Sequence, residues 1–516
     1  MSKYFITTAI DYVNSVPHVG TSYEKIVADA AARWRRLKGD EVFFLMGNDE
    51  HSQNVADKAA QLKLEPRAYC DQMEGKFRET WSKLAVSYDR FIRTTEPAHR
   101  AACQEIFRRL RAKGDIRKGL YKGLYCVGCE ARKTESELQN GRCPNHPATP
   151  LKEMEEENYF FLLTRYADRV KALIQRGDFI DPPFRANEML SVIEQGLEDI
   201  SISRRSTTWG VPIPDDPDQV MYVWFDALIN YITAAGFPDD PSRLARLWPA
   251  DCHLIGKDIT RFHCIIWPAM LMAADLEPPR RVAAHGFVYI DGAKASKSLE
   301  VKDPRIEILK DPMKLAGRVG PDALRYFLLR EVAFGQDGDI SWEKLVTRSN
   351  GDLGKNLGNL LSRVVSMAER SLGGVLPGPG APLPKDAELR AVFDGLADRV
   401  APLMDRLEFH SALAEIFKAS SATNAYIDAT APWKLAKEGK VDELAGVLGN
   451  SAEALRILAL LLSPVVPGFS DRILAQLGIP DLPRRLEIAR EWRYIRPGTR
   501  VRKAEVLFQQ IDVEQL

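Results

Sequence analysis

Two short polar motifs, far apart in the chain, have residue types that could act on a phosphate. The first contains His18 and Gly20, where a strand-like run gives way to a helix-like stretch. Glycine lets a ligand approach the backbone closely, and an imidazole and the first amides of a helix can bind phosphate oxygens. The second motif offers two mobile ammonium groups, Lys294 and Lys297, that can follow charge onto a departing pyrophosphate. Each motif alone is more often an ordinary turn, but together they predict an ATP site assembled from two halves of one sheet.

The elements around these motifs predict a parallel sheet interrupted by an insertion. Runs rich in β-branched and aromatic residues alternate with amphipathic helical stretches, the pattern of crossover helices on a parallel sheet. The expected strands are 3–10, 41–46 and 90–94 before the insertion and 220–224, 253–255 and 282–290 after it, with helices over 21–37 and 261–274.

The fold class is therefore α/β, a Rossmann-like catalytic domain split by an insertion and followed by an all-α bundle. The expected boundaries are 1–116 and 220–290 for the two halves, 117–219 for the insertion, 291–348 for the region of the lysine loop, 349–483 for the bundle and 484–516 for a basic tail that packs back on the body. Lys and Arg outnumber Glu eight to two over 484–503, so the tail is either a solvated strip or a surface for phosphates.

Composition and charge exclude several classes of protein. Lys plus Arg equal Asp plus Glu at 71 each, so any nucleic-acid contact must come from local patches. The longest strongly apolar run, 457–469, is too short to span a bilayer and contains two prolines. The first strand leaves no room for a targeting segment. We therefore expect no membrane contact and a cytoplasmic location.

Cysteine and histidine spacing predicts one metal site in a small module over about 119–155. Cys126 and Cys129 form one pair, and Cys143 and His146 form a second, each with two intervening residues. Such pairs can hold one tetrahedral Zn²⁺, and because protein fills all four positions the zinc would be structural. Unrelated reduced thiols are the less favoured alternative, and seven cysteines are too few for a disulfide scaffold in a chain of this size.

With these features the chain resembles the methionyl-tRNA synthetases, which belong to the class I aminoacyl-tRNA synthetases. Beyond the two motifs and the cysteine module, the resemblance rests on Gly47 to His51, Tyr222 to Ala227, Gly256 to Asp258 with Phe262, His263 and Trp267, Asn359 to Arg363, and Ala431 to Trp433. These segments occur in the family's order and cover essentially the whole chain.

The resemblance implies an enzyme that uses ATP and Mg²⁺ to join L-methionine to tRNA(Met), including the initiator tRNA. Catalytic roles fall to His18, Lys294 and Lys297. ATP would contact those three residues together with Gly20, Thr21, Gly256, Asp258, His285, Gly286, Ser296 and Ser298. Methionine would contact Ala9, Ile10, Tyr12, Asp49, Trp224, Ala227, Tyr231, Phe262, His263 and Trp267. Arg204 would help to close the site, the region 291–348 would contact the tRNA stem, and the anticodon would be read by Asn359, Arg363 and Trp433.

Three positions depart from the family pattern. Thr21 stands where the histidine signature usually ends in a second histidine, and Ala295 replaces the methionine of the lysine loop. Threonine can donate a hydrogen bond to a phosphate but carries no charge, so it would change the rate of the reaction or the binding of ATP. Ala295 removes a hydrophobic anchor and would alter loop closure. Asp11 places a carboxylate near the lip of the expected methionine pocket.

Two other functions compete with this interpretation. Synthetases for leucine, isoleucine or valine carry a large editing domain between the sheet halves, and the stretch here is only about 100 residues long. A non-catalytic tRNA-binding paralogue would account for the departures, but His18, Asp49 and both lysines are retained. Because the chain ends soon after the basic tail, without a further tRNA-binding domain, we expect a monomer.

Overall fold

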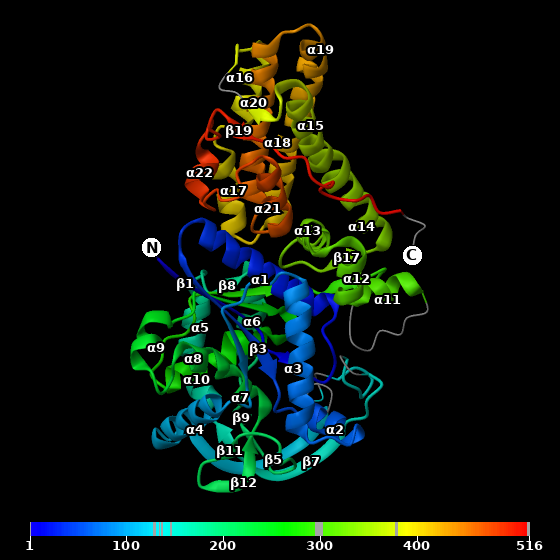
Figure 1. Ribbon diagram of the computed structural model, residues 1–516. Coiled ribbons are helices and arrows are strands. Elements are labelled where there is room, and N and C mark those ends of the chain that lie inside the picture. Colours follow the sequence, from blue (N-terminus) through cyan, green and yellow to red (C-terminus); the bar gives the residue numbers. More distant parts are fainter. Residues whose placement is uncertain are drawn as a thin grey trace.

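The structure is a computed structural model in which an α/β body carries a helical bundle (Figure 1). In Figure 1 the bundle stands above the sheet, and the inserted β-hairpin lies at the opposite end of the body. The structure describes residues 2–126, 131–133, 135, 138–144, 147–294, 303–376 and 380–512.

A parallel sheet forms the centre of the α/β body, as the alternation of strands and helices predicted. Within the described residues it has seven strands. Six of them lie side by side in the spatial order β4 (Arg90–Arg93), β3 (Glu41–Asp49), β1 (Lys3–Thr8), β13 (Cys252–Gly256), β14 (Val282–His285) and β8 (Ile180–Asp181). The seventh, β2 (Asp11–Tyr12), pairs with β3 beyond the point where β1 ends. In the register Leu254 pairs with Thr8 on one side and Ala283 on the other, so the carboxyl ends of β1, β13 and β14 meet at one edge. Ligands of open α/β sheets bind at that edge.

Alternate side chains of the strands enter two separate hydrophobic cores, one on each face of the sheet. Phe44 and Met46 face the core that contains α1 (Val19–Leu37) and the bundle helices, whereas Leu45 faces the core formed with α4 (Pro97–Ala112). The first core runs without a break from the sheet into the bundle. The bundle is therefore packed against α1 and α13 (Pro321–Glu331) of the body and is not a separate lobe on a linker.

The stretch 117–219 contains a separate antiparallel sheet and one strand of the main sheet. Its long strands β5 (Ile116–Cys126) and β7 (Lys152–Phe161) pair from Ile116 with Phe161 to Tyr125 with Lys152. Strand β8 then returns to the edge of the main sheet beside β14.

Two expected elements have a different structure. The run expected as one strand over 282–290 forms β14 in the main sheet and β15 (Val288–Ile290) in a separate small sheet. The sequence predicts a strand over 220–224, but β12 (Asp216–Met221) belongs to a small antiparallel sheet, and α7 (Val223–Leu228) begins directly after Tyr222. The β-branched and aromatic residues there suggested a strand, but burial of one side of a short helix uses the same residue types.

Helix α20 (Val441–Leu462) is the centre of the bundle. It packs against α18 (Phe409–Thr430) and α21 (Pro467–Gln476). Among the described helices it is the one that is long and apolar enough to cross a membrane, by length and composition, but 89% of its most apolar window is buried inside the protein. Its apolarity is that of a core helix.

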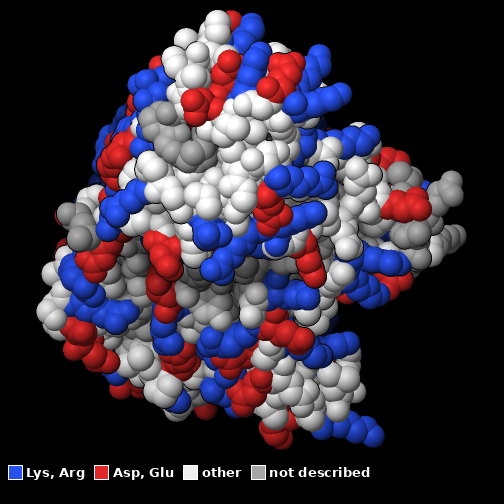
Figure 2. Space-filling view, turned by 45° about the horizontal axis from the view of Figure 1, so that its top comes forward, with Lys and Arg blue, Asp and Glu red and all other residues white. Residues whose placement is uncertain are grey.

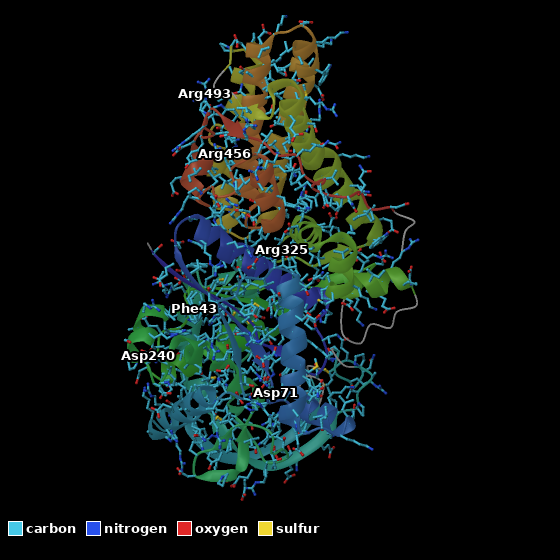
Figure 3. The ribbon with its side chains drawn as sticks, in the orientation of Figure 1. Phe43, Asp71, Asp240, Arg325, Arg456 and Arg493 are labelled. Carbon is cyan, nitrogen blue, oxygen red and sulfur yellow. The ribbon has the colours of Figure 1, made fainter. Side chains whose placement is uncertain are left out.

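Arg325 bonds the bundle to the body from α13 (Pro321–Glu331), where the two parts meet (Figure 3). The fully buried guanidinium pairs with Asp29 of α1 at 2.6 Å. It also donates to the main-chain oxygens of Leu84, at 3.1 Å, and Val465, at 2.7 Å. One side chain therefore joins the helix that follows the histidine signature to the loop between α20 and α21.

The basic tail returns along the bundle towards the body, seen in red beside α15 (Asn359–Leu372) in Figure 1. Strand β19 (Thr499–Arg500) pairs with β18 (Val375–Leu376), and the Asn350 side chain exchanges two hydrogen bonds of 2.8 Å with the main chain of Ile511. Basic and acidic side chains are interspersed over the face shown in Figure 2. Contact between the tail and phosphates stays a prediction.

Candidate active site

Helix α1 begins directly after His18, and the His18 side chain caps it. Its Nδ1 accepts hydrogen bonds from the amides of Gly20 at 3.1 Å and Thr21 at 3.4 Å. The first-turn amides that we expected to face a phosphate are therefore engaged within the cap. Because Nδ1 accepts, a neutral ring carries its proton on Nε2, so His18 itself presents the donor at this end of the helix.

A buried network of charged residues on α1 links the segment after β1 to His285 at the end of β14. The fully buried Lys25 donates to the Ala9 oxygen at 2.8 Å and contacts Asp11 at 3.0 Å and Glu24 at 2.7 Å. The other Glu24 oxygen lies 3.2 Å from Nε2 of His285. Burial alone would lower the pKa of Lys25, but its two carboxylate neighbours outweigh burial and raise that pKa. The ammonium group of Lys25 therefore compensates the negative charge of the Asp11 carboxylate at the edge of the expected methionine pocket.

Two glycines on the expected adenosine side lie close to neighbouring groups. A Cβ on Gly286 would lie 2.2 Å from the Gln336 oxygen, and one on Gly256 would lie 2.7 Å from a carboxylate oxygen of Asp258. The neighbouring His285 ring is also within 4 Å of that second position. At Gly286 the obstacle is the main chain of Gln336 and Asp337, so a larger residue would have to displace that segment, whereas at Gly256 the Asp258 side chain could turn aside.

The expected methionine residues Phe262, His263 and Trp267 lie on one irregular helix. A π-helical turn, η4 (Phe262–Ile266), precedes α10 (Trp267–Ala273), and the Trp267 amide bonds to the Phe262 oxygen. A π turn inserts an extra residue into the helical repeat and occurs often at functional sites.

Hydrogen bonds fix the polar atoms of these rings. His263 donates from Nδ1 to the Ile259 oxygen at 3.1 Å, so its Nε2 accepts the Tyr231 hydroxyl at 2.8 Å. The Trp267 indole donates to His253 at 3.2 Å. Every polar atom named here has a partner.

Both histidines are held neutral by burial. Burial lowers the pKa of His263 to about 4, against weaker opposing effects of the Ile259 carbonyl and Glu24. Burial, and then the nearby His263, also place the pKa of His253 well below its usual range. A pocket with neutral rings suits a thioether, which is apolar and polarisable.

A stacked aromatic pair forms another wall. The rings of Trp224 and Phe262 are parallel within 10°, with centroids 3.9 Å apart, and Tyr12 meets Trp224 edge-on at 6.2 Å. Trp224 and Ala227 lie on α7, so sequence-predicted residues from β2, α7 and η4 contact one another here.

The last residue of β3, Asp49, places a carboxylate beside this wall. Asp49 is 3% exposed, and β2 pairs Tyr12 with it in register. Its neighbour Glu50 is fully buried and accepts from Arg93 at 2.6 Å and from Thr95. These bonds hold the segment on the side opposite the pocket.

Arg204 lies among aromatic rings next to α7. Its guanidinium is 4.2 Å from the ring centroid of Tyr222 and 4.8 Å from that of Tyr121, and it donates to the Ser201 hydroxyl at 2.7 Å. Tyr222 is the residue before α7, so Arg204 braces the start of the helix that carries Trp224.

Two of the four expected zinc ligands are described. Cys126 ends β5, Cys143 follows a tight turn bridged by Gln139 and Arg142, and both side chains are fully buried in a module with few other core residues. Two buried cysteines at these positions fit a structural zinc site. Cys129 and His146, like Ala295, Ser296, Lys297 and Ser298 of the lysine loop, lie outside the described residues.

The expected anticodon residues gather at one place in the bundle. Asn359 begins α15, and Arg363 follows one turn later with its guanidinium 5.7 Å from the ring centroid of Trp433. Trp433 lies on α19 (Pro432–Lys437) and is 46% exposed. An exposed indole beside a guanidinium offers a face on which a base can stack.

Comparison with known proteins decides the family. The family model described as "tRNA synthetases class I (M)" matches residues 4–150 and 129–365, and "Anticodon binding domain of methionyl tRNA ligase" matches residues 376–516. The chain belongs to the methionyl-tRNA synthetase family. It is 45% identical to the methionine–tRNA ligase of Caldanaerobacter subterraneus subsp. tengcongensis, over 99% of this chain and 79% of that one. The corresponding protein of Mycobacterium bovis is 45% identical, over 97% and 96%.

Solved synthetases have the same fold. Mycobacterium tuberculosis methionyl-tRNA synthetase in complex with methionyl-adenylate has a TM-score of 0.92 and 43% identity, covering 98% of this chain and all of that one. The apo form has a TM-score of 0.87 at 41% identity, with 99% of each chain covered. Full-length agreement with this one synthetase family excludes the rival assignment to leucine, isoleucine or valine.

Several residues that shape this synthetase site were not singled out from the sequence. Lys25 and Glu24 are adjacent charges inside a helix that is otherwise amphipathic, and their burial was the missing information. Asp226, in the segment Tyr222 to Ala227, was quoted only as part of the family resemblance.

Proposed function

We propose that this protein is a methionine–tRNA ligase that works in two steps. The carboxylate of L-methionine attacks the α-phosphorus of ATP, pyrophosphate leaves, and the terminal ribose hydroxyl of tRNA(Met) then displaces AMP from the methionyl-adenylate. The observation that carries the proposal is the cluster of aromatic rings and imidazoles formed by Trp224, Phe262, Tyr231 and His263. An apolar pocket and a phosphate-binding helix start at one sheet edge are what this reaction needs.

Catalysis in this mechanism is positioning and stabilisation of charge, because no protein nucleophile is required. His18 would donate from Nε2 to a phosphate oxygen, and Lys294 and Lys297 would neutralise the departing pyrophosphate. Mg²⁺ would enter with ATP and supply further positive charge at its phosphates. Ser296 and Ser298 would donate hydrogen bonds from the same loop.

Methionine would lie with its ammonium at Asp49 and its thioether among the rings. The uncharged Tyr231–His263 pair would contact the methionine side chain, which carries no charge of its own. Ala9, Ile10 and Ala227 would fill the remaining wall, and Arg204 would close the site through Tyr222.

The tRNA would lie along the bundle, with its anticodon at Asn359, Arg363 and Trp433. Initiator and elongator tRNA(Met) share that anticodon, so both would be substrates. The region 291–348 would contact the acceptor stem.

We also propose one structural Zn²⁺ at Cys126, Cys129, Cys143 and His146, a cytoplasmic location and a monomeric state. The domain boundaries given above are part of the same proposal. Exposed large hydrophobic side chains such as Leu62, Phe184 and Val506 come from different elements, as in a monomer. Mass in solution and zinc content of the purified chain test these points.

Methionine-dependent exchange between ATP and pyrophosphate tests the activity. The purified chain should catalyse exchange with methionine and not with leucine, isoleucine or valine. Lys297→Ala should lose exchange while keeping tRNA binding. A chain that binds tRNA(Met) without any exchange would instead be a non-catalytic paralogue.

A further inference from the structure

Asp226 is a buried carboxylate held by two histidines from different segments. One oxygen lies 2.7 Å from Nδ1 of His51, and the other lies 2.6 Å from Nε2 of His99. Asp226 and His99 are fully buried. A buried carboxylate is costly unless it is paired in this way.

The three residues join the parts of the molecule that form the pocket. Asp226 lies on α7 between Trp224 and Ala227, and His51 follows Asp49 by two residues after β3. His99 lies on α4, which packs against α8 (Asn230–Ala235), the helix that follows α7. A single carboxylate thus fixes the aromatic wall relative to the Asp49 segment and fastens both to the body.

The charge on Asp226 makes these bonds strong and directional. Burial would raise the pKa of Asp226, but His51 and then His99 outweigh it and lower that pKa to about 2. The carboxylate is therefore ionised at neutral pH and can only accept, so each imidazole must donate to it. Charge-assisted hydrogen bonds of this kind are shorter and stronger than neutral ones.

The nearby Cys103 raises the alternative of a metal site. Cys103, His99 and Asp226 each present a ligand atom, all within 4.8 Å of one another. However, His99 and Asp226 are at hydrogen-bond distance, and burial followed by the charge of Asp226 keeps the pKa of the Cys103 thiol well above its usual range. A protonated thiol beside an already satisfied pair is a poor metal ligand, so the geometry favours a hydrogen-bonded brace.

We propose that Asp226, held by His51 and His99, is a positioning residue that sets the width of the methionine pocket. This inference rests on the proposed function, because it assigns the pocket to methionine. The brace acts through Trp224, Ala227 and Asp49 and touches none of the reacting atoms. Its loss should therefore weaken methionine binding and leave the use of ATP largely unchanged.

His99 offers a sharp test, because its Nε2 contacts Asp226 directly, while its other ring nitrogen contacts the Thr233 hydroxyl of α8 at 3.3 Å. His99→Ala should raise the KM for methionine in the exchange reaction by about 10- to 100-fold, the effect of misplacing binding groups by about 1 Å. The KM for ATP should stay within about twofold. His99→Gln, whose amide can still donate to Asp226, should recover most of the affinity for methionine.

Cys103→Ala is the matched control. It removes volume from the same buried space on α4, together with the weak thiol contact to Asp226 at 3.9 Å, but keeps both histidine hydrogen bonds to Asp226. Its KM for methionine should therefore stay near that of the wild type. Equal increases in the KM for methionine in His99→Ala and Cys103→Ala would show that Asp226 does not position the methionine pocket. Parallel increases in the KM values for methionine and ATP in His99→Ala would show the same.

Asp226→Asn keeps the inference testable if His99→Ala fails to fold. The amide has the shape of the carboxylate but cannot accept from both rings, so the KM for methionine should again rise selectively. A folded Asp226→Asn variant with an unchanged KM for methionine would overturn the inference. Absence of exchange by the wild-type chain would instead refute the proposed function.

Discussion

The Tyr231 hydroxyl donates to Nε2 of His263 at 2.8 Å, while Nδ1 of the same ring donates to the main chain. Tyr231 can donate in this direction only while His263 is neutral, because an imidazolium has no acceptor. The pKa of His263, lowered by burial to about 4, keeps the pair intact at neutral pH.

Stability should therefore fall as pH is lowered from about 6.5 towards 4. In that window the unfolded chain takes up a proton at His263 at its ordinary pKa of about 6.5, whereas the folded chain does not. The stabilisation is complete above about pH 6.5 and declines by roughly 3 kcal/mol over the whole window. Thermal unfolding midpoints between pH 7.5 and 5 measure this, and His263→Asn should show a shallower decline. An identical decline in the variant would contradict the assignment.

Replacing Lys25 should destabilise the protein strongly. Lys25→Met leaves the Glu24 and Asp11 carboxylates buried without their cation, and removing one partner of a buried pair costs about 3–5 kcal/mol. A lower midpoint of thermal unfolding measures the loss. Lys38→Met is a control at the C-cap of the same helix, because Lys38 pairs with Asp405 at 2.9 Å but is partly exposed. It should cost about 1 kcal/mol or less, and equal losses in both variants would count against the buried network.

Replacing Trp433 should weaken tRNA binding without affecting methionine activation. Stacking of a base on an aromatic side chain contributes about 1–3 kcal/mol, so Trp433→Ala should raise the KM for tRNA(Met) by about 5- to 150-fold. Exchange without tRNA should be unchanged. Phe184→Ala provides the control, because Phe184 is equally exposed at 46% but lies on α6 (Pro183–Glu194), outside the bundle. An effect of Phe184→Ala as large as that of Trp433→Ala would reject the anticodon assignment.

Restoring a histidine at position 21 should speed methionine activation. Thr21→His adds a ring that can carry charge beside His18, and a gain of about 1.4 kcal/mol in the transition state would raise kcat for exchange about tenfold. The KM for methionine should not change, because the pocket is elsewhere. Thr21→Asn, polar but uncharged, should behave like the wild type. A slower Thr21→His variant would show that Thr21 suits this site for another reason.

The sequence predicted the parts of the fold that rest on local pattern. Alternation of strands and helices identified the parallel sheet, and long amphipathic periods identified the bundle around α20. The strand expected over 220–224 was wrong from Val223 onward, because residues that bury one side of a helix look like those of a strand.

The candidate site was predicted residue by residue from family motifs, but the contacts between the residues were not. Nothing in the local sequence indicates that Lys25 meets Asp11 or that Asp226 meets His99, since these contacts depend on how separate segments pack. Capping of α1 by His18 likewise depends on the side-chain rotamer, and it engages amides that the sequence left available for a ligand.

Aminoacylation of tRNA(Met) by the purified chain tests the central claim most directly. With ATP and Mg²⁺, radiolabelled methionine should be esterified to tRNA(Met), while leucine and isoleucine are not and tRNAs with other anticodons remain uncharged. Failure to charge tRNA(Met) with methionine, or equal charging with leucine or isoleucine, would contradict the account.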